Sequence, residues 1–263
     1  FMGRVAGPMT RSVADSALMM DVLSRPDPRD WMSLPYQPLQ FAQRLDGIDL
    51  KGLRIGFLAE MGVGLPVHPE VAAAVSAAAR ALESAGAIVE PVRSFLTPEM
   101  FEAMFVWFEA RSCRDVASMP DAQRAKILPF VLEWCTWRAR QFSGNDVMRG
   151  YQRVMAMREA AVAAVARYDF VLSPTSPIPA YDADAPSPTR DPHDALPHIA
   201  FTVPYNMSEQ PAASVNWDFT GDGLPIGVQL IGQRFDDAGV MRLARALEHL
   251  RPPQRPWPEP PQR

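Results

Sequence analysis

The sequence predicts an α/β fold, and two observations carry that prediction. Two short apolar runs, 53–60 and 87–92, enclose a segment with helical spacing, and such a strand–helix–strand unit implies parallel pairing with a right-handed crossover. Nearer the end of the chain, the runs 212–220 and 225–233 are separated only by Gly-Asp-Gly-Leu, which indicates an antiparallel hairpin.

The first element along the chain is a helix that we expect to begin near Thr10 and to end near residue 23. Thr10 offers a side-chain oxygen as an N-cap, Asp15 places a negative charge in the first turns, and apolar residues recur at helical spacing. Pro8 keeps the residue before it extended, so the helix cannot begin earlier. Residues 24–38 then form a loop that is interrupted by prolines.

The helix between the two apolar runs opens at Pro69, and Gly86 closes it. Its apolar residues fall on one face at helical spacing, as a helix packed on a sheet requires. Residues 97–167 are mostly helical in pattern, with breaks near 119–120 and 143–144. In the helix that opens at Pro69, the apolar face consists of Val71, Val75, Ala78 and Leu82.

The last third of the chain predicts a third strand at 169–175 and a terminal helix at 236–250. Eight prolines between 174 and 204 predict an irregular excursion over the surface. Six prolines within 252–263 predict an extended tail. Because no repeat and no internal linker is visible, we expect residues 1–263 to form a single domain.

Composition excludes several classes of function. A net charge of −4 gives no electrostatic footprint for nucleic acid, and every long apolar stretch is broken before it could span a membrane. No Gly-rich phosphate loop, His-Glu-x-x-His pair or Cys-x-x-Cys pair is present, so we expect no cofactor and no metal. The two cysteines, Cys113 and Cys135, allow at most one disulfide, which fits a cytoplasmic protein.

The spacing of reactive residues does not by itself reveal an active site. Among the four histidines, only His198 precedes an apolar segment and is a candidate for a pocket. Cys135 lies between Trp134 and Trp137. Two interpretations of this thiol stay open, a small apolar core residue or a nucleophile, and the first is favoured because no base is assigned to it.

Four blocks of the sequence resemble the amidase-signature enzymes. The stretch GPMTRSVADSALMMDVLSRPDPRDWMSLP (7–35) resembles the segment that follows the Gly/Ser-rich signature of that family. The similarity continues through DLKGLRIGFLAE (49–60) and YDFVLSPTSPIPA (168–180). It ends with residues 201–248, which contain TVPYN, PAASV and DGLPIGVQLIG. The blocks stand in the family's order and span nearly the whole chain.

This resemblance implies a mixed, twisted sheet flanked by helices (α/β/α) and a serine-dependent amide hydrolase. In the family, a nucleophilic Ser, a second Ser held by a cis peptide bond and a neutral Lys form the catalytic triad. All three precede the Gly-Pro-Met block, which only six residues precede here. Neither Lys51 nor Lys126 has a Ser-Ser-Gly-Gly run to serve. We therefore expect an incomplete fold, the C-terminal part of an amidase, with no catalytic residue of its own.

The resemblance also bears on the substrate. Amidotransferase subunits of the family carry an Asp shortly before Thr-x-Pro-x-Asn, where this chain has Ile199 and Ala200. That difference favours an amidase acting on small or apolar amides. The candidate substrate-binding residues come from the aromatic region around 134 and from the loop that joins two buried strands; they are Trp134, Cys135, Asn206 and Gln210.

Two functional hypotheses remain open at this point. One is a hydrolase of small-molecule amides whose other half lies outside this chain, and the other is a non-catalytic truncated remnant or interaction module. In either case we expect exposed apolar surface, chiefly on the helix at 11–23, and association with the missing half or a homo-oligomer.

Overall fold

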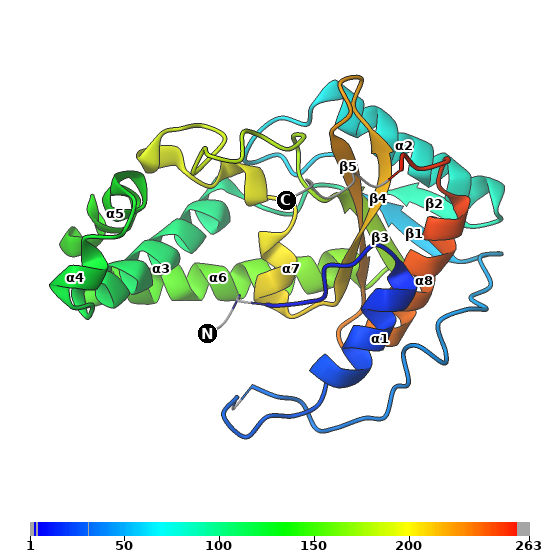
Figure 1. The fold of residues 1–263 in the computed structure, drawn as a ribbon, viewed down its shortest axis with the longest axis horizontal. Coiled ribbons are helices and arrows are strands. Elements are labelled where there is room, and N and C mark those ends of the chain that lie inside the picture. Colours follow the sequence, from blue (N-terminus) through cyan, green and yellow to red (C-terminus); the bar gives the residue numbers. More distant parts are fainter. Residues whose placement is uncertain (1–2, 4, 31, 257–263) are drawn as a thin grey trace, which may run out of the picture.

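A five-stranded mixed sheet forms the centre of the fold (Figure 1). The computed structural model describes residues 3, 5–30 and 32–256, and the strands follow the order β2-β1-β3-β5-β4. β1 pairs in parallel with β2 and with β3, whereas β5 pairs antiparallel with β3 and β4. The strands are β1 (Arg54–Phe57), β2 (Ile88–Pro91), β3 (Phe170–Pro174), β4 (Ala212–Phe219) and β5 (Pro225–Gly232).

Helices cover both faces of this sheet, and a helical arm projects from it. The arm is made of α3 to α6, residues 98–165, and extends away from the strands (Figure 1). Short 3-10 turns occur at Ala139–Gln141 (η1), Pro192–Asp194 (η2) and Pro197–Ile199 (η3). The helices are α1 (Val13–Leu23), α2 (Pro69–Ser84), α3 (Pro98–Ala117), α4 (Asp121–Arg124), α5 (Pro129–Thr136), α6 (Gly144–Val165), α7 (Val203–Ser208) and α8 (Asp237–Leu250).

Two hydrophobic cores lie on opposite faces of the sheet. In the first, α2 and α8 pack on side chains such as Leu172 and Leu230. In the second, helices of the arm and α7 pack on Val171 and Ile231. All five residues of β3 are buried, because successive side chains point into opposite cores. The three consecutive apolar residues 170–172, within the strand predicted at 169–175, are what a strand buried on both faces requires.

The predicted α/β fold with a mixed sheet is confirmed, and most elements lie where the sequence places them. The strand–helix–strand unit, the hairpin and the terminal helix are all present. The segment 174–204 is irregular apart from η2, η3 and the start of α7. Residues 252–256 of the tail form no helix or strand, and 257–263 lie outside the described residues. The assignment of one domain to 1–263 stays a prediction.

The start of α1 differs from expectation, because Ser12 and not Thr10 is the N-cap. The N–H of Asp15 donates to Ser12 Oγ at 3.1 Å. Thr10 Oγ1 instead donates to the carbonyl of Ser12 at 2.7 Å and shares a 2.7 Å hydrogen bond with the hydroxyl of Ser16. Both residues have a hydroxyl that can cap a helix. Ser12 is the N-cap because its backbone is extended and its hydroxyl accepts from the first turn of the helix.

The buried strand β5 offers a direct test of the two-core arrangement. Leu230→Ala removes a fully buried side chain from the first core and should lower the free energy of unfolding by about 2–5 kcal/mol. Leu128→Ala, at a side chain that is 60% exposed, should change it by less than about 0.5 kcal/mol. Urea denaturation followed by circular dichroism measures the free energy of unfolding of both variants. An equal loss in the two variants would contradict the placement of Leu230 in the first core.

Candidate functional site

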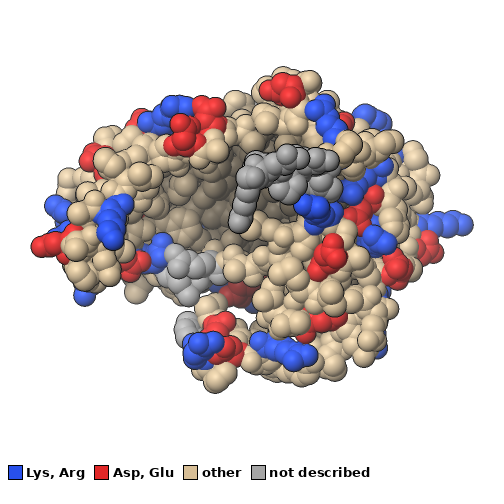
Figure 2. All heavy atoms as spheres, viewed as in Figure 1, with Lys and Arg blue, Asp and Glu red and all other residues tan. Residues whose placement is uncertain are grey.

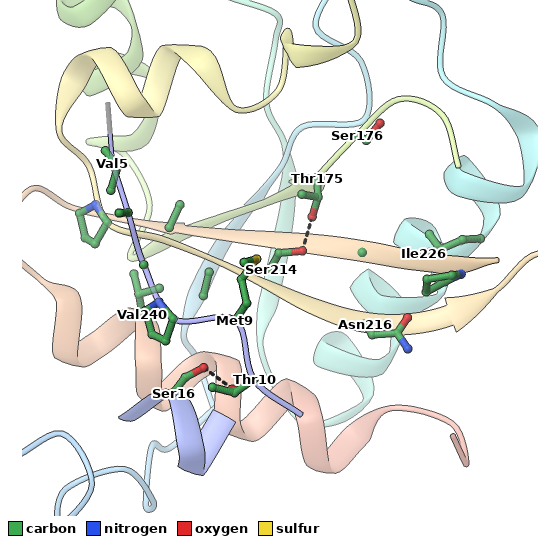
Figure 3. Close-up of a pocket in the computed structure, with 18 of the residues that line it drawn as sticks. Val5, Met9, Thr10, Ser16, Thr175, Ser176, Ser214, Asn216, Ile226 and Val240 are labelled. Atoms are coloured by element: carbon green, nitrogen blue, oxygen red, sulfur yellow. Dashed lines mark hydrogen bonds between the residues drawn. The ribbon is translucent and has the colours of Figure 1, made fainter. Parts of the chain in front are cut away.

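A cleft of about 1060 Å³ opens at the carboxyl end of β3, beside the β4–β5 hairpin. Its lining comes from segments far apart in the sequence, mainly 5–11, 175–181, 210–216 and 225–227. Figure 3 shows the segment from Val5 to Met9 passing across the two strands of the hairpin. Open α/β sheets bind ligands at the carboxyl ends of their strands, so this is the place where a substrate is expected.

The floor of the cleft consists of small side chains. Ser214 of β4 and Thr175 after β3 share a hydroxyl–hydroxyl hydrogen bond of 2.7 Å (Figure 3). A Cβ at Gly227 would stand 2.7 Å from Ser214 Oγ and 3.0 Å from Thr175 Oγ1, so only glycine leaves room for this pair. The result is a shallow polar strip that a ligand or a polypeptide backbone can approach closely.

An aromatic pair forms one wall of the cleft. The rings of Tyr181 and His198 meet edge to face, with their centroids 5.8 Å apart. His198 Nδ1 is buried and has no hydrogen-bond partner among the described residues. Burial lowers the pKa of His198 below its ordinary value of 6.5, so the ring is neutral at pH 7. The surroundings of this wall also carry little charge. In Figure 2, the residues that border the hollow in the middle of the visible face are mainly uncharged.

Of the four residues predicted to bind substrate, Gln210 lines this cleft and Asn206 is not among its lining residues. The Gln210 amide donates to the carbonyl of Gly232 at 3.3 Å and accepts from Ser208 Oγ at 2.8 Å. The Asn206 amide donates to the carbonyl of Gly3 at 3.2 Å. In this structure both amides therefore donate to backbone carbonyls, and the Gln210 amide also accepts from the hydroxyl of Ser208.

Trp134 and Cys135 lie on α5 in the helical arm, which contributes no described residue to the cleft. Burial raises the pKa of the Cys135 thiol above its ordinary value, and a hydrogen bond with Ser112 opposes the rise. Such a thiol is a weak nucleophile. The structure thus does not bring the four residues into one site, and their contact with a substrate stays a prediction.

An ion cluster around the buried Glu109 joins elements of the arm. Arg138 donates to the two carboxylate oxygens of Glu109 at 2.7 and 3.1 Å, and it also pairs with Glu102 at 2.6 Å. Burial raises the pKa of Glu109, while the Arg138 guanidinium opposes that rise. Next to this cluster, the rings of His193 and Trp137 stack with centroids 4.3 Å apart. The stack anchors the irregular segment 174–204 on the arm.

Sequence reasoning missed Thr175, Tyr181 and Ser214 as site residues. Thr175 lies in the block 168–180 that resembles the family, Tyr181 directly follows that block, and Ser214 lies in the Pro-Ala-x-Ser-Val stretch. For Thr175 and Tyr181, their position shortly after the predicted strand was the available signal. Neither Lys51 nor Lys126 is among the residues that line the cleft. Within the described ranges there is no group of three or more His, Cys, Asp or Glu that could hold a metal ion. No described helix is long and apolar enough to cross a membrane.

Comparison with known proteins now decides the family. A family model described as "Amidase" matches residues 3–241. The chain belongs to the amidase family. Its place among the amidase-signature enzymes agrees with the four sequence blocks and with the mixed sheet.

Two curated relatives illustrate the range of this amidase family. The chain is 31% identical over 265 residues to a glutamyl-tRNA(Gln) amidotransferase subunit of Myxococcus xanthus (strain DK1622), across 92% of this chain and 54% of the relative. It is also 31% identical over 251 residues to an acylamidase of Rhodococcus erythropolis, across 94% of this chain and 52% of the relative. The chain therefore spans about half the length of the curated relatives it matches.

Solved structures agree on the fold. The crystal structure of a bacterial aryl acylamidase of the amidase-signature family superposes with a TM-score of 0.78 at 28% identity. That likeness covers 93% of this chain and 52% of the acylamidase. About half of the acylamidase therefore has no counterpart in this chain, as is also the case for the two curated relatives.

The neutral wall of the cleft predicts a pH dependence. Because the folded chain holds His198 with a lowered pKa, the unfolded chain binds more protons below about pH 6.5, and stability falls as the pH drops. His198→Phe keeps the ring and removes this titration, so its free energy of unfolding should fall less between about pH 7 and pH 5. Urea denaturation across that range measures the difference. The same pH dependence in both proteins would contradict the burial of a neutral His198.

Proposed function

We propose that this chain forms the substrate-facing part of an amidase that hydrolyses the C–N bond of small or apolar carboxylic amides. One observation carries the proposal: the cleft at the carboxyl end of β3 is built from the blocks that match the amidase family. The name of the Rhodococcus erythropolis relative, acylamidase, supports amide hydrolysis as the reaction class. The two free thiols, Cys113 and Cys135, support a cytoplasmic location.

The lining residues have complementary roles in this proposal. The hydroxyls of Thr175 and Ser214 provide donors and acceptors for an amide group, and they lie on a floor with room for it. Tyr181 and neutral His198 provide an apolar wall for the acyl or amine substituent. An uncharged wall disfavours charged substrates because a charge placed against it loses its hydration.

The reacting groups come from outside these residues. As the family resemblance implies, a Ser oxygen attacks the amide carbon, and its proton passes through a second Ser to a neutral Lys. The C–N bond then breaks, the amine leaves with a proton, and water releases the acid from the acyl-enzyme. This chain provides walls for that reaction, while Lys51 and Lys126 do not line the cleft.

A second candidate is the glutamine-dependent amidotransferase reaction, which the likeness to the Myxococcus xanthus protein favours. Against it stand Ile199 and Ala200, which occupy positions where the resemblance implies an Asp for the amino group of glutamine. A third candidate is a non-catalytic remnant or interaction module, which would have the amidase fold and would not take part in amide hydrolysis.

Binding to the cleft tests the proposed substrate class. We expect a neutral anilide to bind the chain weakly, and Tyr181→Ala to weaken that binding by about tenfold, since an aromatic contact is lost. The matched control is Tyr151→Ala on α6, whose side chain is 36% exposed and lies outside the cleft lining. Saturation-transfer NMR and calorimetry measure both. An equal loss of affinity in the two variants would show that the anilide binds outside the cleft.

Catalysis provides a separate test. The purified 263-residue chain should not hydrolyse aryl or aliphatic amides above background, because it lacks the Ser–Ser–Lys triad of the family. Amine release measured by chromatography checks this over a panel of amides. Turnover that Lys51→Ala or Lys126→Ala abolishes would show that the chain carries its own base, and the division of labour proposed above would then be wrong.

A further inference from the structure

A second cavity lies in the helical arm, apart from the cleft. Its volume is about 420 Å³, which is within the range of pockets that hold small molecules. Its lining comes from α3, from η1 with the residue after it, and from α6, and it shares no described residue with the lining of the cleft. We call this space, bordered by segments 102–106, 138–142 and 146–153, the arm cavity.

One side of the arm cavity is apolar. Gly150 of α6 is buried, and a Cβ at this position would stand 3.3 Å from Val106 Cγ1 and 3.5 Å from the carbonyl oxygen of Ala103. The glycine therefore lets α6 approach α3 closely and adds no side chain to the cavity. Phe142, which follows η1, also lines the cavity and is half-buried. These residues offer an apolar surface against which a flat ring can lie.

The carboxylates that line the arm cavity already have partners within the protein. Glu102 pairs with Arg138 at 2.6 Å, and the buried Glu109 holds the same guanidinium at 2.7 Å. Asp146 caps the start of α6, where its Oδ2 accepts from the N–H of Ser143 at 2.9 Å and from the hydroxyl of Ser143 at 2.6 Å. Arg138 and the two lining carboxylates are therefore satisfied without a ligand.

Two other guanidinium groups of the arm cavity are not satisfied in this way. Arg149 and Arg153 both line the cavity and stand one turn apart on α6, where like charges repel each other. Among the described residues, Arg149 pairs only with Asp146, at 3.6 Å, which is too long for a hydrogen bond. Arg153 has no hydrogen bond or ion pair with any residue that the structure describes. The pKa of Glu99 is lowered mainly by its own backbone N–H and by Thr97, and the charge of Arg153 adds to this.

We propose that the arm cavity binds a small aromatic anion. Its carboxylate or phosphate group accepts hydrogen bonds from Arg149 and Arg153, and its ring lies against Val106 and Phe142. The planar fork of a guanidinium matches the spacing of the oxygens in both kinds of oxyanion, and a negative charge between the two arginines removes their repulsion. Because this site is separate from the cleft, it does not depend on the proposed function.

Binding of small probes to the 263-residue chain tests the charge of the ligand. Benzoate and phenyl phosphate are titrated by calorimetry and by ligand-observed NMR. We expect one or both to bind, with an affinity that falls as salt is added, because salt screens an exposed guanidinium. Binding of only one of the two would identify its oxyanion as the group that the cavity holds. Absence of binding by both would overturn the proposal.

Matched variants locate the bound anion. Arg149→Gln and Arg153→Gln should each weaken its binding by about tenfold, because each removes a charged donor. Arg153→Lys keeps the charge and loses the fork, so it should weaken binding less than Arg153→Gln. Arg140→Gln is the control, since Arg140 is exposed and lies outside the cavity lining. Thermal melts of the free variants compare their folding. The same affinity in Arg153→Gln and in Arg140→Gln would overturn the proposal.

Neutral benzamide separates this inference from the proposed function. Under the proposed function, benzamide binds in the cleft and should lose affinity in Tyr181→Ala and not in Arg153→Gln. Binding of benzoate or phenyl phosphate that Arg153→Gln weakens and Tyr181→Ala leaves unchanged supports the arm cavity, whether or not benzamide binds. An anion whose affinity falls in Tyr181→Ala and not in Arg153→Gln would lie in the cleft, and would overturn the proposal.

Discussion

The burial of β3 on both faces is the constraint on which the structure depends. Phe170 and Leu172 point into the core under α2 and α8, while Val171 points into the core under α7 and the arm. Behind them, the buried amide of Gln229 donates to Ser173 Oγ at 3.1 Å and to the carbonyl of Phe201 at 2.9 Å. A buried amide is costly unless it is satisfied, so this pair of bonds fixes the register of β5 against β3 and ties the segment before α7 to the sheet. With β3 fixed, the chain that leaves its carboxyl end contributes residues 175, 176 and 178–181 to the lining of the cleft.

The chemistry of the cleft follows from that position. Thr175 is the first residue beyond β3, and its hydroxyl reaches Ser214 because Gly227 leaves space between them. The neutral ring of His198 and the ring of Tyr181 close the wall above. These groups can hold and orient an amide, yet none is a strong base or an activated nucleophile. Under the proposed function, recognition and bond cleavage are therefore divided, and this chain carries recognition.

The sequence predicted the sheet well because its signals are local. A short strand-like segment with Phe170, Val171 and Leu172 at its centre indicated β3. A helix that begins with Pro and ends at Gly, between two short apolar runs, indicated the parallel unit, and a four-residue turn indicated the hairpin. The site was harder, because a side chain's partner is a tertiary choice. Asn206 and Gln210 have the chemistry of ligand-binding amides, but their bonds go to the backbone carbonyls of Gly3 and Gly232. Composition likewise indicated an extended tail and could not indicate that Gln254 would bond to β4.

The insertion of the arm between β2 and β3 has a consequence for the order in which the chain folds. Ile55 of β1 pairs with Phe170 of β3, so the whole arm must be synthesised before the centre of the sheet can close. The unit β1–α2–β2 and the contact of α3 with α6 involve shorter loops, and their closure costs less entropy. Until β3 is synthesised, one edge of β1 therefore remains unpaired, and Leu58, which follows β1, is not yet packed in the second core. A nascent chain in that state exposes hydrophobic surface and an unpaired strand edge, which makes it prone to aggregation until β3 is synthesised.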